Sequence, residues 1–183
     1  TNAIIILSIL LWLTLNSLEK KELGFLPLNK LEIIILLLLL LLFITIISGA
    51  FMAGTHAGQS FNTYPLMNGN LIPDDYFIKE YGLKNLFENT VAINFNHRWV
   101  ATLTFFALIA MSFYLYCIKK IKNLNVQIIL VLFFTLLQFL LGILTLLTNV
   151  KVYLASLHQV NSIILLASVL LIYHSIKRKV VYV

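Results

Sequence analysis

The sequence predicts an all-α fold: a polytopic transmembrane helical bundle, made of four helices preceded by one truncated helix. Composition is the first observation, because 61% of the 183 residues are hydrophobic, 11% are charged and the mean hydropathy is +0.97. These values exclude an ordinary soluble domain. The second observation is that several apolar runs reach the ~20 residues needed to cross a bilayer. The third is that lysines cluster beside the ends of these runs, as topology-setting residues do. The net charge of +6 therefore predicts no nucleic-acid partner.

The expected helices follow in order along the chain. The first apolar run, residues 1–16, is short for a span, so we expect the end of a truncated transmembrane helix from a preceding bundle rather than a signal peptide. A charged loop with Gly24 and Pro27 follows it. Helices are then expected over residues 31–53, 90–118, 126–148 and 152–175, which form a four-helix bundle over residues 31–175 with a polar outer loop at 54–89. The single cysteine, Cys117, predicts no internal disulfide.

Basic residues predict the orientation of this bundle. Nine of the 13 Lys and Arg residues lie in the loop 17–30, in the turn that follows residue 118 and in the tail that follows residue 176. The positive-inside rule places these three segments, and the C-terminus, on the inner side of the membrane. The loop 54–89 and the beginnings of helices 90–118 and 152–175 are then expected on the outer side.

Two histidines, His97 and His158, lie near the outer ends of helices that run in the same direction. Ionisable residues inside a membrane span are costly and usually mark a site. A pair at matched depth on non-adjacent helices favours a metal or haem between them, because a porphyrin between two helices takes one neutral imidazole from each side. The alternative is that both histidines are structural and are satisfied by cross-helix hydrogen bonds.

Small and polar residues recur at helical spacing beside these histidines and mark the expected inward faces of the helices. They either leave space for a flat ligand or are simply close-packed helix contacts. Zinc is disfavoured, because no cysteine or inward carboxylate lies near enough to complete a tetrahedral shell. The four inward faces are Thr45, Ser48, Gly49 and Ala53; His97, Ala101 and Thr104; Gln138, Gly142, Thr145 and Asn149; and Ala155, His158 and Ser162.

Three other side chains are candidates for a role near this site. His56 is a rival ligand, but its flexible Gly-Thr-His-Ala-Gly setting predicts a loop residue. His174 is expected to be solvated with the basic tail. Arg98 points about 100° round the helix from His97, so it cannot face the same metal. It is expected either to bind a porphyrin propionate at the rim or to reach the outer headgroups.

Several motifs, spread in order over nearly the whole chain, point to one family. They are GAFMAG at 49–54, AG at 57–58, NTYPLMNG at 62–69, FEN at 87–89, NHR at 96–98, QFLLGILT at 138–145 and LHQ at 157–159. Together they resemble the haem A synthase family, the cytochrome oxidase assembly enzymes that oxidise a methyl group of haem O to the formyl group of haem A.

The resemblance implies that this chain is the C-terminal one of two repeated four-helix bundles, with residues 1–16 matching the last helix of the first. It implies that His97 and His158 are the axial iron ligands of a haem b cofactor. The family's catalytic bundle carries a glutamate three residues before its first histidine, and Asn94 stands at that place here. We therefore expect no catalytic residue in this half, and we expect that this chain alone does not make haem A.

The resulting expectation is an oxidoreductase, the C-terminal half of a haem A synthase. The expected location is the bacterial plasma membrane or the mitochondrial inner membrane, with the C-terminus on the cytoplasmic or matrix side. Expected partners are haem O through the missing N-terminal half, membrane lipid, an electron-transfer partner, haem O synthase and a further copy of the chain in a homo-oligomer. Two alternatives remain: a non-enzymatic b-type cytochrome or haem carrier, and a structural membrane subunit without a cofactor.

Overall fold

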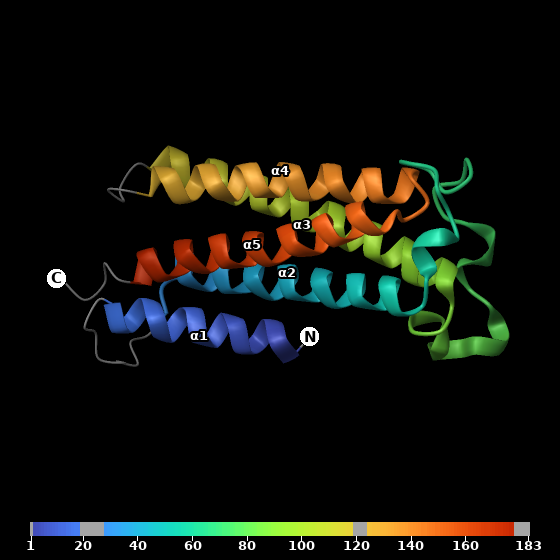
Figure 1. Ribbon diagram of the computed structural model, residues 1–183, viewed down its shortest axis with the longest axis horizontal. Helices are drawn as coiled ribbons and strands as arrows, with labels where there is room; N and C mark the ends of the chain where they lie inside the picture. Colours follow the sequence, from blue (N-terminus) through green and yellow to red (C-terminus); the bar gives the residue numbers. More distant parts are fainter. Residues whose placement is uncertain (1, 19–27, 119–123, 178–183) are drawn as a thin grey trace.

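Five α-helices account for most of the computed structural model, which describes residues 2–18, 28–118 and 124–177 (Figure 1). Short 3-10 helices, η1 to η3, occupy the segment between α2 and α3. Four of the α-helices in these ranges are long and apolar enough to cross a membrane. The elements are α1 (Asn2–Leu18), α2 (Lys30–Gly54), η1 (Ala57–Gln59), η2 (Asp74–Tyr76), η3 (Lys79–Leu86), α3 (Thr90–Ile118), α4 (Asn125–Leu147) and α5 (Val152–Lys177).

The four long helices pack in a ring, α2 to α3, α3 to α4, α4 to α5 and α5 back to α2. Helices α3 and α5 therefore occupy diagonal positions and run in the same direction. The segment 55–89 and the α4–α5 turn lie at one end of the bundle, here called the loop end (Figure 1). The fold is the predicted all-α polytopic membrane bundle, and each expected helix agrees with the observed one to within two residues at either end.

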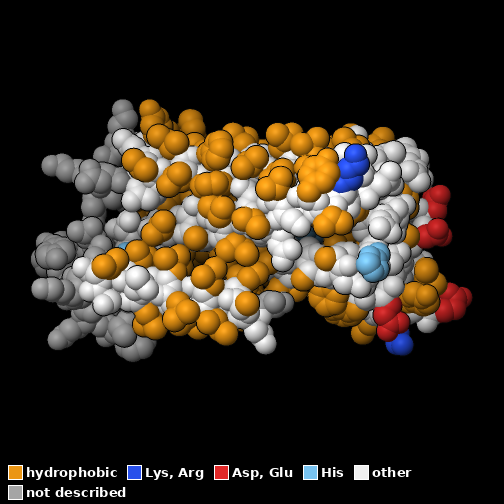
Figure 2. Space-filling model, viewed as in Figure 1, with side chains coloured by type: hydrophobic (Ala, Val, Ile, Leu, Met, Phe, Trp, Pro, Cys, Tyr) orange, Lys and Arg blue, Asp and Glu red, His pale blue; other side chains and the backbone are white. Residues whose placement is uncertain are grey.

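Apolar side chains both fill the centre of the bundle and cover its outside. Ile35, Leu108, Val131, Val169 and Ile172 are at most 1% exposed and form the heart of the core. Figure 2 shows hydrophobic side chains spread along the length of the bundle, with Asp and Glu side chains at the loop end. Because lipid is as apolar as the core, the many exposed Leu, Ile and Phe side chains indicate a surface that faces hydrocarbon.

Helix α1 packs against α5 and corrects one expectation. The Trp12 ring lies 5.4 Å from the Tyr173 ring and 5.1 Å from the His174 ring, measured between centroids. Asn16 Oδ1 lies 3.1 Å from His174 Nε2. His174 is therefore only 6% exposed rather than solvated with the basic tail, because α1 covers it. The break at Gly24 and Pro27 and the lysines that follow residue 118 lie outside the described residues.

Polar side chains cap the N-terminal ends of α2 and α3. At the start of α2, Asn29 Oδ1 accepts from the Glu32 amide at 2.9 Å, and the Glu32 carboxylate accepts from the Asn29 amide at 3.0 Å. This reciprocal capping explains why Glu32 is buried. At the start of α3, Asn89 Oδ1 accepts from the Val91 amide at 2.9 Å. Its Nδ2 donates to the carbonyls of Asp75 and Tyr76 and ties the preceding loop to the helix.

Candidate haem-ligand pair at the loop end

His97 lies on α3 and packs against the face of α2. Its Nδ1 is 2.8 Å from Ser48 Oγ. A Cβ added to Gly49 would come within 3.2 Å of His97 Cε1, so only glycine lets the imidazole lie this close to α2. One turn deeper, the hydroxyls of Thr45 and Thr104 are 2.7 Å apart and join the same two helices.

The partners of Ser48 determine which nitrogen of His97 carries the proton. Ser48 Oγ donates its single proton to the Thr45 carbonyl at 2.8 Å. A hydroxyl has only one proton to donate, so this geometry favours a contact with His97 that runs the other way, from Nδ1–H to Ser48 Oγ. His97 is then the Nδ1-protonated tautomer, with its free lone pair on Nε2. That nitrogen is available to a metal.

His158 lies on α5 and packs against α4 in a similar way. A Cβ added to Gly142 would come within 3.0 Å of His158 Cε1. His158 Nε2 is 3.2 Å from Gln138 Nε2. The polar neighbour again comes from the preceding helix, but it contacts the other ring nitrogen.

The hydrogen-bond network around Gln138 determines the tautomer of His158. Asn161 Nδ2 donates to the Phe134 carbonyl at 3.0 Å and to Gln138 Oε1 at 2.7 Å. The Gln138 amide is thereby oriented with its NH₂ group towards His158. Since an amide nitrogen only donates, His158 Nε2 accepts and Nδ1 carries the proton. Among the described residues, Nδ1 of His158 is buried without a hydrogen-bond partner.

The two imidazoles belong to diagonal helices at the same end of the bundle. Within the described ranges, no group of three or more His, Cys, Asp or Glu side chains is placed to hold a metal ion. Two imidazoles from opposite helices are the ligands that a bis-histidine haem takes, because the porphyrin brings the other donors of the iron with it.

Arg98 joins the loop (residues 55–89) to α3 through hydrogen bonds. Its Nε donates to Asn94 Oδ1 at 2.7 Å, and its two terminal nitrogens donate to the carbonyls of Thr63 and Phe61, both at 2.8 Å. The sequence predicted a porphyrin propionate or lipid headgroups as its partner and did not identify these backbone carbonyls. Contact with a cofactor stays a prediction for Arg98.

Asn94 is fully buried and holds two elements together. Besides accepting from Arg98, it donates through Nδ2 to the Ala57 carbonyl of η1 at 2.7 Å. A glutamate at this position could accept from Arg98, but an ionised carboxylate has no proton to donate to Ala57. The amide at Asn94 therefore has a structural role that a carboxylate could not fill.

The loop also contacts the α4–α5 turn, so it covers the end of the bundle above both histidines. Asn62 Nδ2 donates to Asn149 Oδ1. A Cβ added to Gly58 would come within 3.0 Å of a Val150 methyl group. The ring of Tyr64 packs edge-on against Phe139 of α4. Loop residues thus contact both α4 and the α4–α5 turn.

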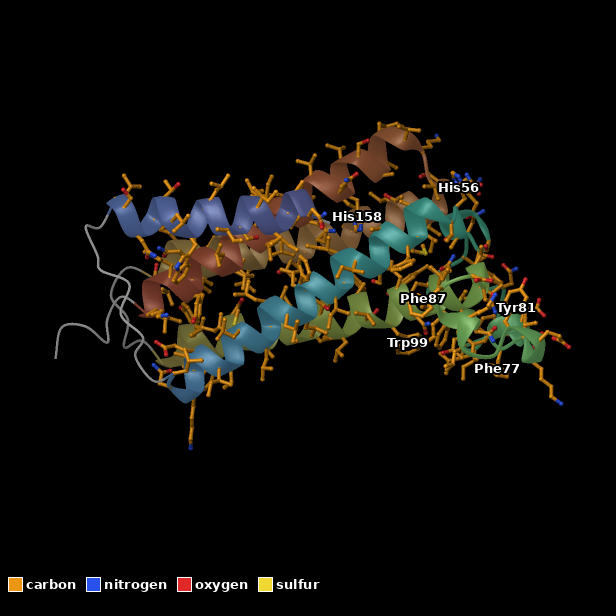
Figure 3. All side chains as sticks on the ribbon, turned by 90° about the horizontal axis from the view of Figure 1, so that it is seen from below. His56, Phe77, Tyr81, Phe87, Trp99 and His158 are labelled. Carbon is orange, nitrogen blue, oxygen red and sulfur yellow. The ribbon has the colours of Figure 1, made fainter. Side chains whose placement is uncertain are left out.

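The sequence-predicted site residues are brought together only in part. The inward faces are largely right, since Ser48, Gly49, Gln138 and Gly142 all contact a histidine. Ala53 and Asn149, expected to extend these faces, are exposed at the loop end. His56 is an exposed loop residue, as predicted, and its backbone is left-handed. It lies away from His158 (Figure 3). Asn161 was missed, although a polar residue inside an apolar span was the signal for it.

Fold and site together define a multi-pass helical membrane protein with a histidine pair between diagonal helices. The COX15-CtaA family model, described as cytochrome oxidase assembly protein, matches residues 1–170. This chain belongs to that family, which confirms the predicted resemblance.

Curated relatives carry the name haem A synthase. The protein of Granulibacter bethesdensis is 37% identical over 178 residues, which cover 96% of this chain and 46% of that protein. The haem A synthase COX15 of Arabidopsis thaliana is 39% identical over 135 residues, 74% of this chain and 30% of that protein. A Wolbachia pipientis protein is 39% identical over 126 residues, 68% of this chain and 36% of that protein. The chain spans less than half the length of these relatives, and no solved structure matches it significantly.

Proposed function

We propose that this chain is the C-terminal half of a haem A synthase and holds a haem b between His97 and His158. The observation that carries the proposal is that the hydrogen bonds assign the proton of both histidines to Nδ1 and the lone pair to the same ring nitrogen, Nε2, where that of His158 accepts from Gln138. Nε2 is a suitable iron-ligand atom when the other nitrogen carries the proton. Family membership and the names of the relatives support the same assignment.

The residues around the histidines fit a flat cofactor. Gly49 and Gly142 present no side chain to the imidazoles. The buried hydroxyl of Thr145, one of the expected inward-facing residues of α4, has no partner among the described residues, and buried polar groups without partners are costly. When bound, haem would supply one-electron redox chemistry. The chain's own contribution would be to hold the iron from both sides and to cover the site with the loop.

The oxidation of haem O to haem A would need residues that the described part of the chain does not place at the site. Proton removal in such a reaction is usually given to a positioned carboxylate or histidine. Among the described acids, Glu32 is held in a helix cap at the opposite end, and Asp74, Asp75, Glu80 and Glu88 are exposed in the loop. Asn94 holds the place of the family's glutamate and cannot act as a base. The substrate would therefore bind in the other half of the enzyme.

The test is haem extraction from cells that have a haem O source but no haem A synthase of their own. Cells expressing this chain alone should yield bound haem b with a low-spin reduced-minus-oxidised spectrum and no haem A. Cells expressing a full-length chain should yield haem A. Haem A from this chain alone would overturn both the half-enzyme role and the cofactor role of the histidines. Absence of any haem spectrum would favour a structural subunit.

The proposal includes the sidedness predicted from the basic residues. The loop end would face the periplasm or the intermembrane space, and the C-terminus would face the cytoplasm or the matrix. Reporter fusions at the C-terminus and within the loop should report opposite sides, with the C-terminal reporter inside. An electron-transfer partner, haem O synthase and a second copy of the chain stay predictions.

A further inference from the structure

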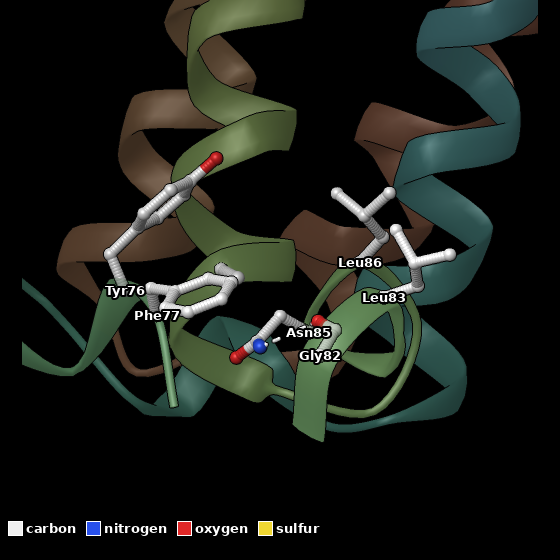
Figure 4. Close-up of a pocket in the computed structure, with 7 residues that line it drawn as sticks. Tyr76, Phe77, Gly82, Leu83, Asn85 and Leu86 are labelled. Carbon is white, nitrogen blue, oxygen red and sulfur yellow. Dashed lines mark hydrogen bonds between the residues drawn. The ribbon is translucent and has the colours of Figure 1, made fainter. Parts of the chain in front are cut away.

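A cavity of about 190 Å³ lies at the loop end, outside the histidine site. It is formed between η2, η3 and the first turn of α3. Figure 4 shows Tyr76 and Phe77 on one side of it and Leu83 and Leu86 on the other. The residues used below are Tyr76, Phe77, Leu83, Asn85, Leu86 and Ala92.

The polar groups of this cavity are already bonded to the protein. Asn85 Nδ2 donates to the carbonyls of Ile78 and Gly82, both at 2.8 Å, and its Oδ1 accepts from the Ile78 amide at 2.9 Å. The Tyr76 hydroxyl donates to Asn96 Oδ1 at 3.2 Å. What these groups leave for a ligand is apolar surface. A sugar or an ion would lose its hydration without replacement there, whereas hydrocarbon would not.

The rim of the cavity is strongly apolar and exposed. Leu83 is 85% exposed, Phe77 63% and Leu86 49%. The same short segment carries the exposed charges Lys79, Glu80, Lys84 and Glu88, with Lys84 and Glu88 paired at 3.6 Å. Apolar and charged side chains on one short segment are typical of elements that lie in the membrane interface.

Aromatic contacts connect this segment to the spans. The Tyr76 ring is 4.9 Å from the Phe95 ring, which is 6.0 Å from Trp99 on the exposed face of α3. Phe87 contacts Phe51 of α2 at 5.7 Å. In Figure 3, Phe77 and Trp99 lie along one edge of the loop end, and His56 lies along the other. Tyr and Trp gather at the level of the lipid headgroups, so the cavity opens where the apolar surface of the spans continues into the loop.

We propose that the segment 77–87 lies at the boundary between headgroups and acyl chains, and that the cavity binds part of an acyl chain of a phospholipid in the adjacent leaflet. A dry apolar cavity of roughly 150 Å³ is known to hold benzene. The observed volume therefore suits a short run of methylene groups rather than a whole lipid. This site is independent of the histidine pair and of the activity proposed above.

The test is photo-crosslinking of the protein in phosphatidylcholine nanodiscs. One phospholipid probe carries a diazirine in the upper part of an acyl chain, and a second carries it on the headgroup. Mass spectrometry should find acyl-probe adducts on Leu83 and Leu86. The substitution Ala92→Phe, which fills the cavity from α3, should reduce these adducts by about tenfold, since each excluded methylene forfeits most of its burial energy. Adducts on the lipid-facing Leu103 and Phe106 should be unchanged.

A second pair of variants covers the case in which Ala92→Phe fails to fold. Leu83→Lys puts a charge at the exposed rim and should also deplete the acyl adducts, whereas Leu71→Lys adds the same charge elsewhere in the loop and should not. Undiminished adducts in both Ala92→Phe and Leu83→Lys would overturn the proposal. So would labelling by the headgroup probe alone, or a segment free of lipid adducts and crosslinked to a second copy of the chain.

Discussion

His97 and His158 share a tautomer but reach it through different partners. On the α2–α3 side, the Ser48 hydroxyl accepts the Nδ1 proton of His97 and leaves Nε2 without competition from Ser48. On the α4–α5 side, the Gln138 amide donates to His158 Nε2, the atom that would bind iron, and Nδ1–H is left without a partner among the described residues. One imidazole is oriented through its remote nitrogen and the other through its ligand nitrogen.

This difference divides the proposed site into a fixed side and an adjustable side. His97 can bind iron while it keeps its hydrogen bond, so its orientation is set in advance. His158 can bind iron only if Gln138 moves, which costs one hydrogen bond, about 1 kcal/mol. The Gln138 amide would keep Asn161 as a partner after such a movement. Substitutions on the two sides should therefore have different effects.

Removal of either His97 or His158 should have the largest effect on haem binding. His97→Ala and His158→Ala should each abolish the low-spin haem spectrum, because one imidazole cannot occupy both axial positions. His56→Ala should keep the full spectrum, since His56 is exposed in the loop. Reduced-minus-oxidised spectra of the purified variants provide the measurement. A spectrum that survives the first two changes, or is lost in the third, would reverse the ligand assignment.

Asn94→Ala should have the next largest effect, on stability. It would leave Arg98 Nε and the Ala57 carbonyl without their partner, which costs about 2–3 kcal/mol for groups that include a charge. Denaturant unfolding in detergent micelles measures the change. Asn96→Ala is the matched control, because among the described residues the Asn96 side chain accepts a single hydrogen bond, from Tyr76 at 3.2 Å, and its loss should cost less than about 1 kcal/mol. Equal losses in the two variants would contradict the central role of Asn94.

Ser48→Ala should lower haem affinity, whereas Gln138→Ala should not. Loss of the partner of a ligating histidine typically weakens metal binding by about 10-fold or more, so Ser48→Ala should weaken haem retention. Gln138→Ala removes a competitor from His158 Nε2 and should leave affinity unchanged or raise it. Haem transfer to apomyoglobin measures both. Ser168→Ala is the control, since its hydroxyl donates to the Ile164 carbonyl of the same helix, α5. Weakening by Gln138→Ala equal to that of Ser48→Ala would remove the distinction between the two sides.

Alanine substitutions at Gly49 and Gly142 should have the smallest effects on haem affinity. An added Cβ would meet His158 Cε1 at 3.0 Å in Gly142→Ala and His97 Cε1 at 3.2 Å in Gly49→Ala. Each imidazole must shift by a few tenths of an ångström, and we expect a loss of affinity of roughly threefold, larger at Gly142. Gly54→Ala, whose Cβ would meet nothing within 4 Å, should have no effect. Electron paramagnetic resonance of the oxidised haem would report the tilt of each ligand.

The helices could be predicted closely because the length of an apolar run and its polar ends are local properties of the sequence. Rotation of the helices about their axes was predicted less well. Small and polar residues marked the correct general faces, but the exposed Ala53 fits the same spacing as the inward Gly49. Which face of a transmembrane helix points inward depends on the neighbouring helix that packs against it. A run of nearly uniform Leu and Ile carries little information about that face.

Long-range partners could not be inferred from local patterns. His174 lies in a basic segment that predicts solvation, yet Trp12 and Asn16, more than 150 residues earlier, bury it. Arg98 suggested an anionic partner, but its hydrogen bonds run to carbonyls of residues 61 and 63. Carbonyl groups are present at every residue, so the sequence gives no sign of which ones will face a guanidinium.

The attachment of the loop to the α4–α5 turn has a consequence for biogenesis. Asn62 bonds to Asn149, which lies 87 residues further along the chain, and Gly58 packs on Val150. These contacts cannot exist until the last two helices have been synthesised and have entered the bilayer. His97 is already in place on α3 by then, but the cover above it closes only when α5 arrives with His158. The loop end of the bundle therefore stays without this cover until the α4–α5 turn and α5 are in place.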